Sequence, residues 1–381
     1  MGQRLMAAAP ERAADVLIEE HAAPGGRVVA EVTLNVEATL NSLSLGMAHT
    51  IAAALRAWRD DERVACVLFR GAGDRAFCAG GDIQALYAAM VKNHAAGRVV
   101  DDYPFQFFEH EYRLDYLIHT YPKPVVALGH GVVMGGGLGI YSASRFRVVT
   151  EASRIACPEV TIGLFPDAGA TWLLRNLNPA LAVFLGCTGS HVNCADALQT
   201  GIGTHGTSGA SRPGVVAALG AVDYAGDATD FDRVDEALSA LPGPELPESQ
   251  VGDVPDSLGL EGSYADVAGR IGALAGTSRW VDRGIATMRS GCPTSVGILV
   301  EQLRRAPGLG LADCFRLEMT VGTHCAHNED FTEGIRALLI EKDNRPRWRY
   351  GDLDGLDADH VLGHFEAPWP SNPLHDLEDD G

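Results

Sequence analysis

Lysine is scarce in this chain, and acidic side chains far outnumber basic ones. Only Lys92, Lys123 and Lys342 occur, and 30 Lys and Arg residues stand against 50 Asp and Glu, which gives a formal net charge of −20. Proteins that bind nucleic acid or anionic membranes need clustered basic residues. We therefore exclude both as general partners. An anionic small ligand is not excluded, because a local basic patch or a helix N-terminus can hold it.

Paired cysteines and long apolar runs are also missing. The eight cysteines form no C-x-x-C pair, and several lie in apolar stretches, as Cys66 does in Val64–Phe69. This pattern is typical of free thiols in a reducing compartment. No run of 18 apolar residues occurs, and residues 1–20 contain four acids but no apolar signal region. We therefore expect no membrane span and no secretion, and a cytoplasmic location.

Several motifs for nucleotides, metals and hydrolysis are absent. No G-x-G-x-x-G opens a helix, and neither G-x-x-x-x-G-K-[ST] nor G-x-S-x-G occurs. Their absence argues against dinucleotide binding, a P-loop and the common serine-hydrolase turn. His324 and His327, with Cys325 between them, make an incomplete zinc site. We expect no metal and no cofactor.

Short strands alternate with helices in the first half of the chain. Helical spacing of apolar residues predicts a helix over 44–59. Apolar, β-branched runs predict strands at Val28–Leu34, Val64–Phe69, Pro124–Leu128, Phe146–Thr150 and Arg154–Cys157. This order predicts an α/β core over residues 27–205.

The composition changes near residue 205. Residues 206–262 are rich in Gly, Pro, Asp and Ser, which predicts a variable, partly helical segment. Residues 263–370 have helical patterning and predict a helical C-terminal region. We expect residues 1–26 to form a mobile lead-in and residues 371–381 to form a frayed acidic tail.

Two glycine-rich loops precede predicted helices, Cys78-Ala-Gly-Gly-Asp82 and Met134-Gly-Gly-Gly-Leu138. Glycine allows the backbone to approach a ligand closely and to adopt positive φ. Free N–H groups at two such loops can converge on one developing negative charge and form an oxyanion hole. Each loop alone also fits an ordinary tight turn.

Two acids, Glu159 and Asp167, lie in an otherwise apolar stretch. Gly163 and Pro166 interrupt any continuous helix between them, so both side chains can face one cavity. Acids are costly to bury unless they are paired or used. In a dry site one carboxyl tends to keep its proton while the other ionises, which suits acid–base chemistry. A surface turn with two solvated acids is the alternative.

These motifs resemble the crotonase (enoyl-CoA hydratase/isomerase) superfamily and, within it, the 3-hydroxyisobutyryl-CoA hydrolase family most closely. The resemblance covers roughly residues 27–205 and 275–365. The stretches that carry it are Arg75–Ile83, Pro122–Pro124, Met134–Gly137, Pro158–Asp167, Asp330–Asp343 and Pro346–Trp348.

The resemblance implies a spiral of repeated β-β-α units followed by helices, and an acyl-CoA substrate with no other cofactor. It places an oxyanion hole on the N–H groups of Gly81 and Gly136, and the two catalytic acids on Glu159 and Asp167. Crotonases often form trimers, so the resemblance allows a homo-oligomer, but the different C-terminal helices leave the oligomeric state open.

Three further substrate contacts follow from the resemblance, at Glu111, Gly135 and Asp82. The sequence pattern around Glu111 on its own favours a solvated helix face. For that residue the pattern and the resemblance therefore predict different environments, solvent and a substrate contact.

The implied reaction is thioester hydrolysis, with Glu159 as nucleophile or as base for water and 3-hydroxyisobutyrate as a product of valine breakdown. Hydratases of the superfamily carry a second glutamate at the position of Gly139, so its absence favours a hydrolase. Dienoyl-CoA isomerases match both Glu159 and Asp167. A hydratase, such an isomerase and a non-catalytic acyl-CoA-binding scaffold therefore stay open as alternatives.

Overall fold

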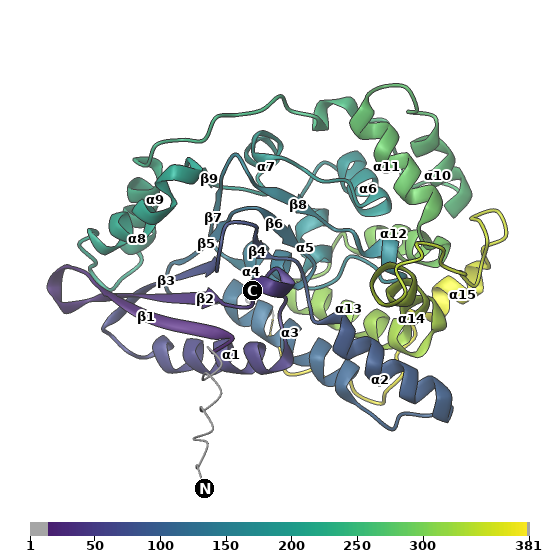
Figure 1. Ribbon diagram of the computed structural model, residues 1–381, viewed down its shortest axis with the longest axis horizontal. Coiled ribbons are helices and arrows are strands. Elements are labelled where there is room, and N and C mark those ends of the chain that lie inside the picture. The colour runs from purple at the N-terminus through teal and green to yellow at the C-terminus, as the bar shows by residue number, and fades with distance from the viewer. Residues whose placement is uncertain (1–13, 379–381) are drawn as a thin grey trace, which may run out of the picture.

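Two sheets form the centre of the molecule (Figure 1). The computed structural model describes residues 14–378. The larger sheet has the strand order β1-β2-β3-β5-β7-β9, and the smaller has the order β4-β6-β8. The strands are β1 Val16–Ala22, β2 Val28–Leu34, β3 Val64–Gly71, β4 Ala76–Cys78, β5 Val125–Gly129, β6 Val132–Met134, β7 Phe146–Val149, β8 Arg154–Ala156 and β9 His205–Gly206.

The chain winds between the two sheets as a spiral. From β2 onward the neighbouring strands are parallel, and β3, β5 and β7 of the larger sheet each lead directly into β4, β6 and β8 of the smaller one. Helices follow each such pair and return the chain to the larger sheet. The predicted spiral of β-β-α units is thereby confirmed.

Helices surround the sheets and make up most of the second half of the chain. The predicted helices over 44–59 and in the C-terminal region are present, with small differences at their ends. The helices are α1 Leu45–Arg59, α2 Ile83–Ala96, α3 Tyr103–His119, α4 Gly136–Ala143, α5 Ala170–Arg175, α6 Pro179–Thr188, α7 Cys194–Thr200, α8 Arg212–Gly220, α9 Thr229–Ser239, α10 Tyr264–Gly272, α11 Arg279–Ser290, α12 Pro293–Arg305, α13 Leu311–His327, α14 Glu329–Ile335 and α15 Ala358–Gly363.

The central strands β2, β3, β5 and β7 of the larger sheet are buried on both faces, because successive side chains along them point alternately into two cores. On β3, Val67 and Phe69 belong to the main core, whereas Cys66 and Leu68 belong to a second, smaller core. Helices α8 and α9 supply the other side of that second core. The predicted variable segment 206–262 thus includes the cover of the sheet's outer face.

Two expectations about the ends of the chain were wrong in part. Residues 16–22 of the expected lead-in form β1, which pairs with β2 as an antiparallel edge strand; residues 1–13 lie outside the described part. The expected frayed tail packs against the protein, since Leu374 is fully buried and Asp376 pairs with Arg113 at 2.8 Å. Residues 379–381 again lie outside the described part.

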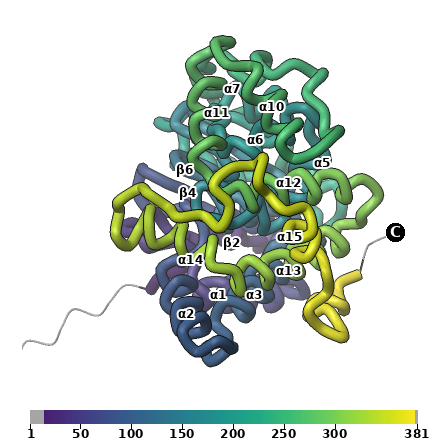
Figure 2. The backbone as a smooth tube through the Cα atoms, turned by 90° about the vertical axis from the view of Figure 1, so that its right-hand side faces the viewer, coloured from purple at the N-terminus to yellow at the C-terminus, as the bar shows by residue number. Residues whose placement is uncertain are grey.

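Segments that are distant in the sequence lie side by side around the smaller sheet. Figure 2 shows α14 next to α2, on the side of the molecule where β4 and β6 also lie. Among the helices of residues 14–378, none has the length and apolar character needed to cross a bilayer.

Candidate active site

The three short strands β4, β6 and β8 bring the predicted site residues to one edge. Because the strands are parallel neighbours, their carboxyl ends meet at the same edge of the small sheet. Gly80 and Gly81 follow β4, Gly135 and Gly136 follow β6, and Glu159 follows β8. Residues that are far apart in sequence therefore converge for a topological reason.

The two glycine loops present free N–H groups. Leu43 forms a parallel bridge with Gly81 and bonds to both of its neighbours, accepting from the N–H of Asp82 and donating to the carbonyl of Gly80. This arrangement turns the N–H of Gly81 away from Leu43. Gly136 is the first residue of α4, where an N–H has no acceptor within the helix. Within residues 14–378, neither N–H donates to a protein acceptor.

Glycine is required at both positions of the second loop. Gly135 has φ of 50°, in the left-handed region that glycine tolerates best. A Cβ at Gly136 would overlap Oε1 of Glu111 and would lie 3.6 Å from the N of Gly81. The two loops and the Glu111 carboxyl are therefore in close contact, and a side chain at 136 would separate them.

A cavity of about 330 Å³ opens at this edge. Its wall contains Gly81, Gly135 and Gly136 together with the carboxyls of Glu111, Glu159 and Asp167, and the remaining wall is mostly apolar. The apolar wall residues are Ile83, Leu86, Phe107, Phe108, Met134, Ile162, Leu164, Leu338 and Leu339. The three acids are at most 7% exposed. The alternative of a surface turn with two solvated acids was therefore wrong for Glu159 and Asp167. The solvated helix face that the sequence pattern favoured for Glu111 was wrong as well.

Some polar atoms of this cavity have no partner in the protein. Oε1 of Glu111 and Oε2 of Glu159 are both buried without a hydrogen bond. Such atoms are rare in native proteins and usually have a ligand, a water or a catalytic role. These oxygens lie in the same cavity as two free backbone N–H groups, so the cavity can bind a polar group that reacts.

Asp167 and the residues that follow it are held by hydrogen-bond partners that the sequence did not reveal. The hydroxyl of Tyr112, on α3, donates to Oδ2 of Asp167 at 2.7 Å. Glu318, on α13, accepts the N–H of Gly169 at 2.7 Å and that of Thr171 at 2.8 Å. Tyr112 could have been noticed as the neighbour of Glu111 in the sequence, whereas nothing in the sequence connects Glu318 with a segment some 150 positions earlier.

Burial raises the pKa of every acid in the cavity, and repulsion between the acids raises it further for Glu111 and Glu159. For Glu159 burial is the larger cause and the charge of Asp167 the second, and its pKa lies well above the usual range. The pKa of Glu111 is raised well above its usual range for the same two reasons. Burial raises the pKa of Asp167 to about 6, against the hydrogen bond from Tyr112, which lowers it. The acids thus have different proton affinities, as acid–base chemistry requires.

Asp82 is the one predicted contact that the structure does not bring to the cavity. Its carboxyl caps α2 by accepting the N–H of Ala85 at 3.2 Å. The side chain is therefore occupied at a helix end, and the expectation of a substrate contact has no support in the geometry.

Position 139 is closed to any side chain. A Cβ at Gly139 would lie 2.5 Å from Oδ2 of Asp115 and 3.0 Å from Cβ of Ala168. Asp115 is fully buried, and both of its carboxylate oxygens lack a partner. A second glutamate of the hydratase kind at 139 would have to displace the Asp115 carboxyl and shift the segment that carries Asp167.

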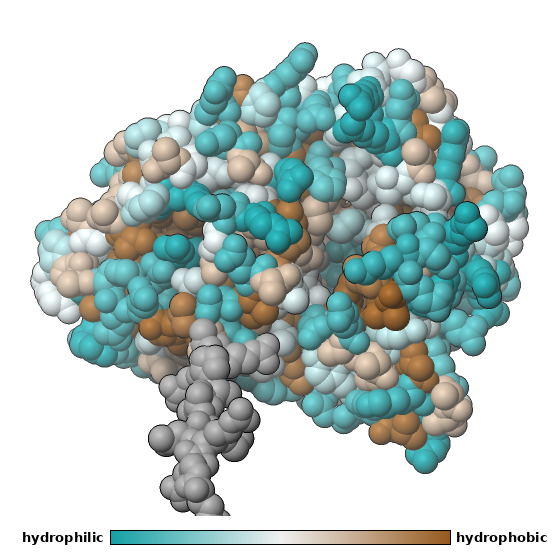
Figure 3. Space-filling view, in the orientation of Figure 1, coloured by the Kyte–Doolittle hydropathy of each residue, from teal (hydrophilic) through white to brown (hydrophobic). Residues whose placement is uncertain are grey.

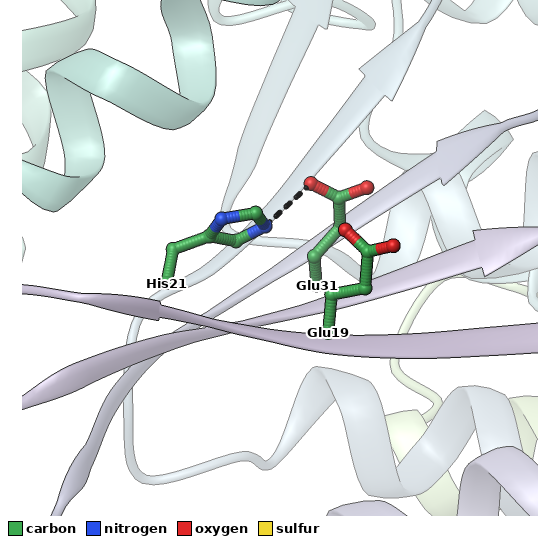
Figure 4. Close-up of side chains that lie close together, drawn as sticks. All are labelled: Glu19, His21 and Glu31. Atoms are coloured by element: carbon green, nitrogen blue, oxygen red, sulfur yellow. Dashed lines mark hydrogen bonds and ion pairs between the residues drawn. The ribbon is translucent and has the colours of Figure 1, made fainter.

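One group of potential metal ligands exists among the described residues, far from this cavity. Glu19 and His21 on β1 lie beside Glu31 on β2 (Figure 4). Glu31 already has a His21 partner at 3.0 Å and accepts a hydrogen bond from Thr33 at 2.9 Å. The group therefore has a sufficient structural explanation.

The histidines of the incomplete zinc motif have other partners. A ring nitrogen of His324 lies 2.7 Å from the carbonyl of Glu366, and one of His327 lies 2.8 Å from the carbonyl of Thr323. Both rings are thus engaged with backbone.

Comparisons with known proteins point to one family. The family model described as enoyl-CoA hydratase/isomerase matches residues 29–365. The chain is 31% identical to the mitochondrial 3-hydroxyisobutyryl-CoA hydrolase of Gallus gallus, over 96% of this chain and 91% of that protein. It is also 31% identical to 3-hydroxyisobutyryl-CoA hydrolase 1 of Arabidopsis thaliana, over 92% and 91%.

Solved structures agree with this result. A crystal structure titled as a carnitinyl-CoA dehydratase from Mycobacterium thermoresistibile superposes with a TM-score of 0.81 at 32% identity, over 96% of this chain and 99% of that one. One titled as an enoyl-CoA hydratase from Rhodobacter sphaeroides superposes with a TM-score of 0.79 at 32% identity, over 93% and 98%.

Proposed function

Because the chain belongs to the enoyl-CoA hydratase/isomerase family, we propose that it hydrolyses acyl-CoA thioesters, with 3-hydroxyisobutyryl-CoA as its substrate. The observation that carries the proposal is the convergence of two free N–H groups and three buried carboxyls on one largely apolar cavity. The choice of the 3-hydroxyisobutyryl group rests on the relatives from Gallus gallus and Arabidopsis thaliana, which are named as hydrolases of 3-hydroxyisobutyryl-CoA.

The thioester carbonyl oxygen binds between the N–H groups of Gly81 and Gly136. Negative charge develops on that oxygen as the carbonyl carbon becomes tetrahedral, and each well-placed donor commonly stabilises it by about 3–4 kcal/mol. The apolar wall strengthens this effect, because hydrogen bonds to a charged atom are stronger where water is excluded.

Glu159 attacks the carbonyl carbon or activates the water that does so. In the first route the C–S bond breaks to leave a mixed anhydride between the acyl group and Glu159, and water then hydrolyses this anhydride and frees the carboxylate. In the second route water attacks the thioester carbon directly as Glu159 takes its proton. In both routes the CoA sulfur takes a proton and water supplies the oxygen that completes the hydrolysis. Asp167 binds the 3-hydroxyl of the substrate or supplies the proton to sulfur. Glu111 contacts the substrate through the carboxyl that lies against Gly136.

A hydratase of the same fold is the main alternative, since solved relatives carry such titles. The closed space at Gly139 argues against it, because the second glutamate of hydratases has no room there. The hydrolase names of the relatives argue in the same direction.

Thiol release distinguishes the two reactions. The purified protein should release free thiol from 3-hydroxyisobutyryl-CoA, and faster than from isobutyryl-CoA, which lacks the hydroxyl. Hydration of crotonyl-CoA without thiol release would refute hydrolysis and favour a hydratase. Binding of acyl-CoA with neither reaction would favour the non-catalytic scaffold.

Location and assembly belong to the same proposal. All eight cysteines are buried thiols outside any disulfide, which supports a reducing compartment such as the cytoplasm. The animal relatives, however, are named as mitochondrial, so cell fractionation has to decide between the two. A homo-oligomer is proposed from the family resemblance, and sedimentation of the purified protein tests it.

A further inference from the structure

The segment that carries Asp167 has an unusual backbone. Ala168 has φ of 53° and Gly169 has φ of 82°, both in the left-handed region. For alanine this conformation is rare and costly. Such a backbone persists only where the surrounding structure fixes it, so the residues that hold this segment also determine where the Asp167 carboxyl lies.

Two buried side chains from the C-terminal helices hold this segment. Glu318 uses both carboxylate oxygens, one for the N–H of Gly169 and the other for that of Thr171. Gln302, on α12, donates to the carbonyl of Pro166 at 2.7 Å and to the hydroxyl of Thr171 at 2.6 Å. Both side chains are fully buried, and neither lines the cavity.

An acid is an expensive choice for this purpose. Glu318 interacts electrostatically with other acidic groups around it. The charge of Asp167 raises the pKa of Glu318. The charge of Glu318 in turn raises the pKa values of Glu111, Tyr112, Asp115, Cys157 and Glu159. Placing one more carboxyl here raises the repulsion within the site. A contact that served only the stability of the fold could be made by an uncharged side chain, without this added repulsion. A carboxylate, however, accepts two backbone N–H groups at once, and here it binds those of Gly169 and Thr171, where the strained segment enters α5.

We propose that Glu318 is a positioning residue of the reaction, which fixes residues 168–171 so that the Asp167 carboxyl reaches the 3-hydroxyl of the acyl group. The proposal rests on the proposed function for the identity of that hydroxyl. Gln302 assists from the other side of Asp167 through the carbonyl of Pro166. A displacement of about 1 Å at such a position commonly costs about a hundredfold in rate.

The matched control is Asp230 on α9. It is also buried, at 3% exposed, and its two carboxylate oxygens accept the N–H groups of Ala225 and Gly226 at 2.7 and 2.8 Å. It lies on α9, whose Val234 and Leu238 belong to the second core, and it does not line the cavity. Asp230→Asn therefore reproduces the loss of a buried carboxylate that binds two N–H groups, without disturbing the site.

A double-mutant cycle separates positioning from stability. Glu318→Gln keeps the size of the side chain but replaces one acceptor oxygen with an N–H₂ group that faces a backbone N–H. We expect kcat/KM for 3-hydroxyisobutyryl-CoA to fall by about ten- to a hundredfold. We also expect the preference over isobutyryl-CoA to disappear, both in this variant and in Asp167→Asn. When Asp167→Asn is already present, adding Glu318→Gln should lower kcat/KM by less than a further factor of about three. The losses are not additive because the two residues act as a unit.

Asp230→Asn should change neither the rate nor the substrate preference, whatever it does to the melting temperature. If the effects of Glu318→Gln and Asp167→Asn multiply, or if Glu318→Gln keeps the preference for the hydroxylated substrate, the proposal is wrong. Should Glu318→Gln fail to fold, Gln302→Met removes the assisting contact and must show the same non-additivity with Asp167→Asn; additive losses would overturn the proposal.

A crystal structure of Glu318→Gln tests the geometry without any assay. We expect residues 168–171 and the Asp167 carboxyl to be displaced, and an unchanged segment would overturn the proposal. This result holds even if the wild-type protein releases no thiol, in which case only the proposed function fails.

Discussion

At the scale of single residues, the electrostatics of the cavity make the reaction depend on pH in a defined direction. Glu159 has to be ionised to act as nucleophile or base, so kcat/KM should rise as pH rises through its pKa. Burial and the charge of Asp167 raise that pKa above the usual value for glutamate. The rise in activity should therefore occur at higher pH than for an ordinary, solvated carboxyl.

Replacing Asp167 shifts this profile. Asp167→Asn removes a negative charge that disfavours ionisation of Glu159, so the pKa of Glu159 falls and the acid limb of kcat/KM moves to lower pH. The residual activity is lower because the contact with the 3-hydroxyl is lost. Rate profiles of the wild type and the variant between pH 4 and 9 check the direction, and a limb that moves to higher pH would contradict the assignment.

Single residues also show what the sequence can and cannot predict. Glu159, Asp167 and the glycines of both loops could be predicted, because each lies in a local motif of the family. The burial of Glu111 could not be predicted from pattern, since a helix with polar residues on several sides gives no clear inner face. Glu318 was missed because its role depends on the packing of α13 against a segment from the other half of the chain.

At the scale of elements, a short π-helix closes the cavity. Residues Arg336–Ile340 follow α14 as a π-helical turn, closed by the N–H of Glu341 and the carbonyl of Arg336 at 2.8 Å. The widened turn places two successive residues, Leu338 and Leu339, on the cavity wall. Such turns are frequent at functional sites. Figure 3 shows apolar surface at several places on this face of the molecule, one of them in the region of α14.

Arg336 fixes this turn at both ends. Its guanidinium pairs with Glu333 at 2.7 Å before the turn, and with Glu341 at 2.5 Å and Asp343 at 2.8 Å after it. The pairs form a network, which is the arrangement in which partly exposed ion pairs contribute most to local order. The sequence resemblance included this stretch but not its π-helical form, and the turn contacts α2 from a distant part of the sequence.

The leucines of the turn should restrict the size of the acyl group. Leu339→Ala should raise kcat/KM for a longer acyl-CoA relative to that for 3-hydroxyisobutyryl-CoA by about tenfold, because a few methylene groups in an apolar pocket discriminate at that level. Leu246→Ala is the control, since that leucine is 57% exposed and does not line the cavity. An unchanged ratio in Leu339→Ala would show that the turn does not contact the acyl group.

At the scale of the whole molecule, the two ends of the chain contribute to the fold. The N-terminal β1 extends the larger sheet, and the acidic tail covers α3 and α13. The sequence predicted neither. In β1 the apolar run is only three residues long, Val16 to Ile18, and acids follow it, whereas in the tail Leu374 and Leu377 are isolated among polar and acidic neighbours. The central spiral could be predicted, since its strands are apolar on both faces and its motifs are local.

The tail's contribution to stability can be measured directly. Leu374 is fully buried, so Leu374→Ala should lower the free energy of unfolding by about 2–5 kcal/mol. Urea denaturation of the two proteins provides the value. Leu362→Ala, at a leucine that is 38% exposed, should have a much smaller effect. Equal stabilities of Leu374→Ala and the wild type would mean that the tail is frayed in solution.

The central claim is that Glu159, placed beside two backbone N–H donors, breaks the thioester. The measurement that tests it most directly is the rate of thiol release from 3-hydroxyisobutyryl-CoA by Glu159→Gln, compared with Glu31→Gln, a buried glutamate on β2 outside the cavity. The account predicts a loss of about a hundredfold or more in kcat for Glu159→Gln, in the range for removal of an acid–base or nucleophilic group, and wild-type rates for Glu31→Gln. Thiol release at the wild-type rate by Glu159→Gln would contradict it.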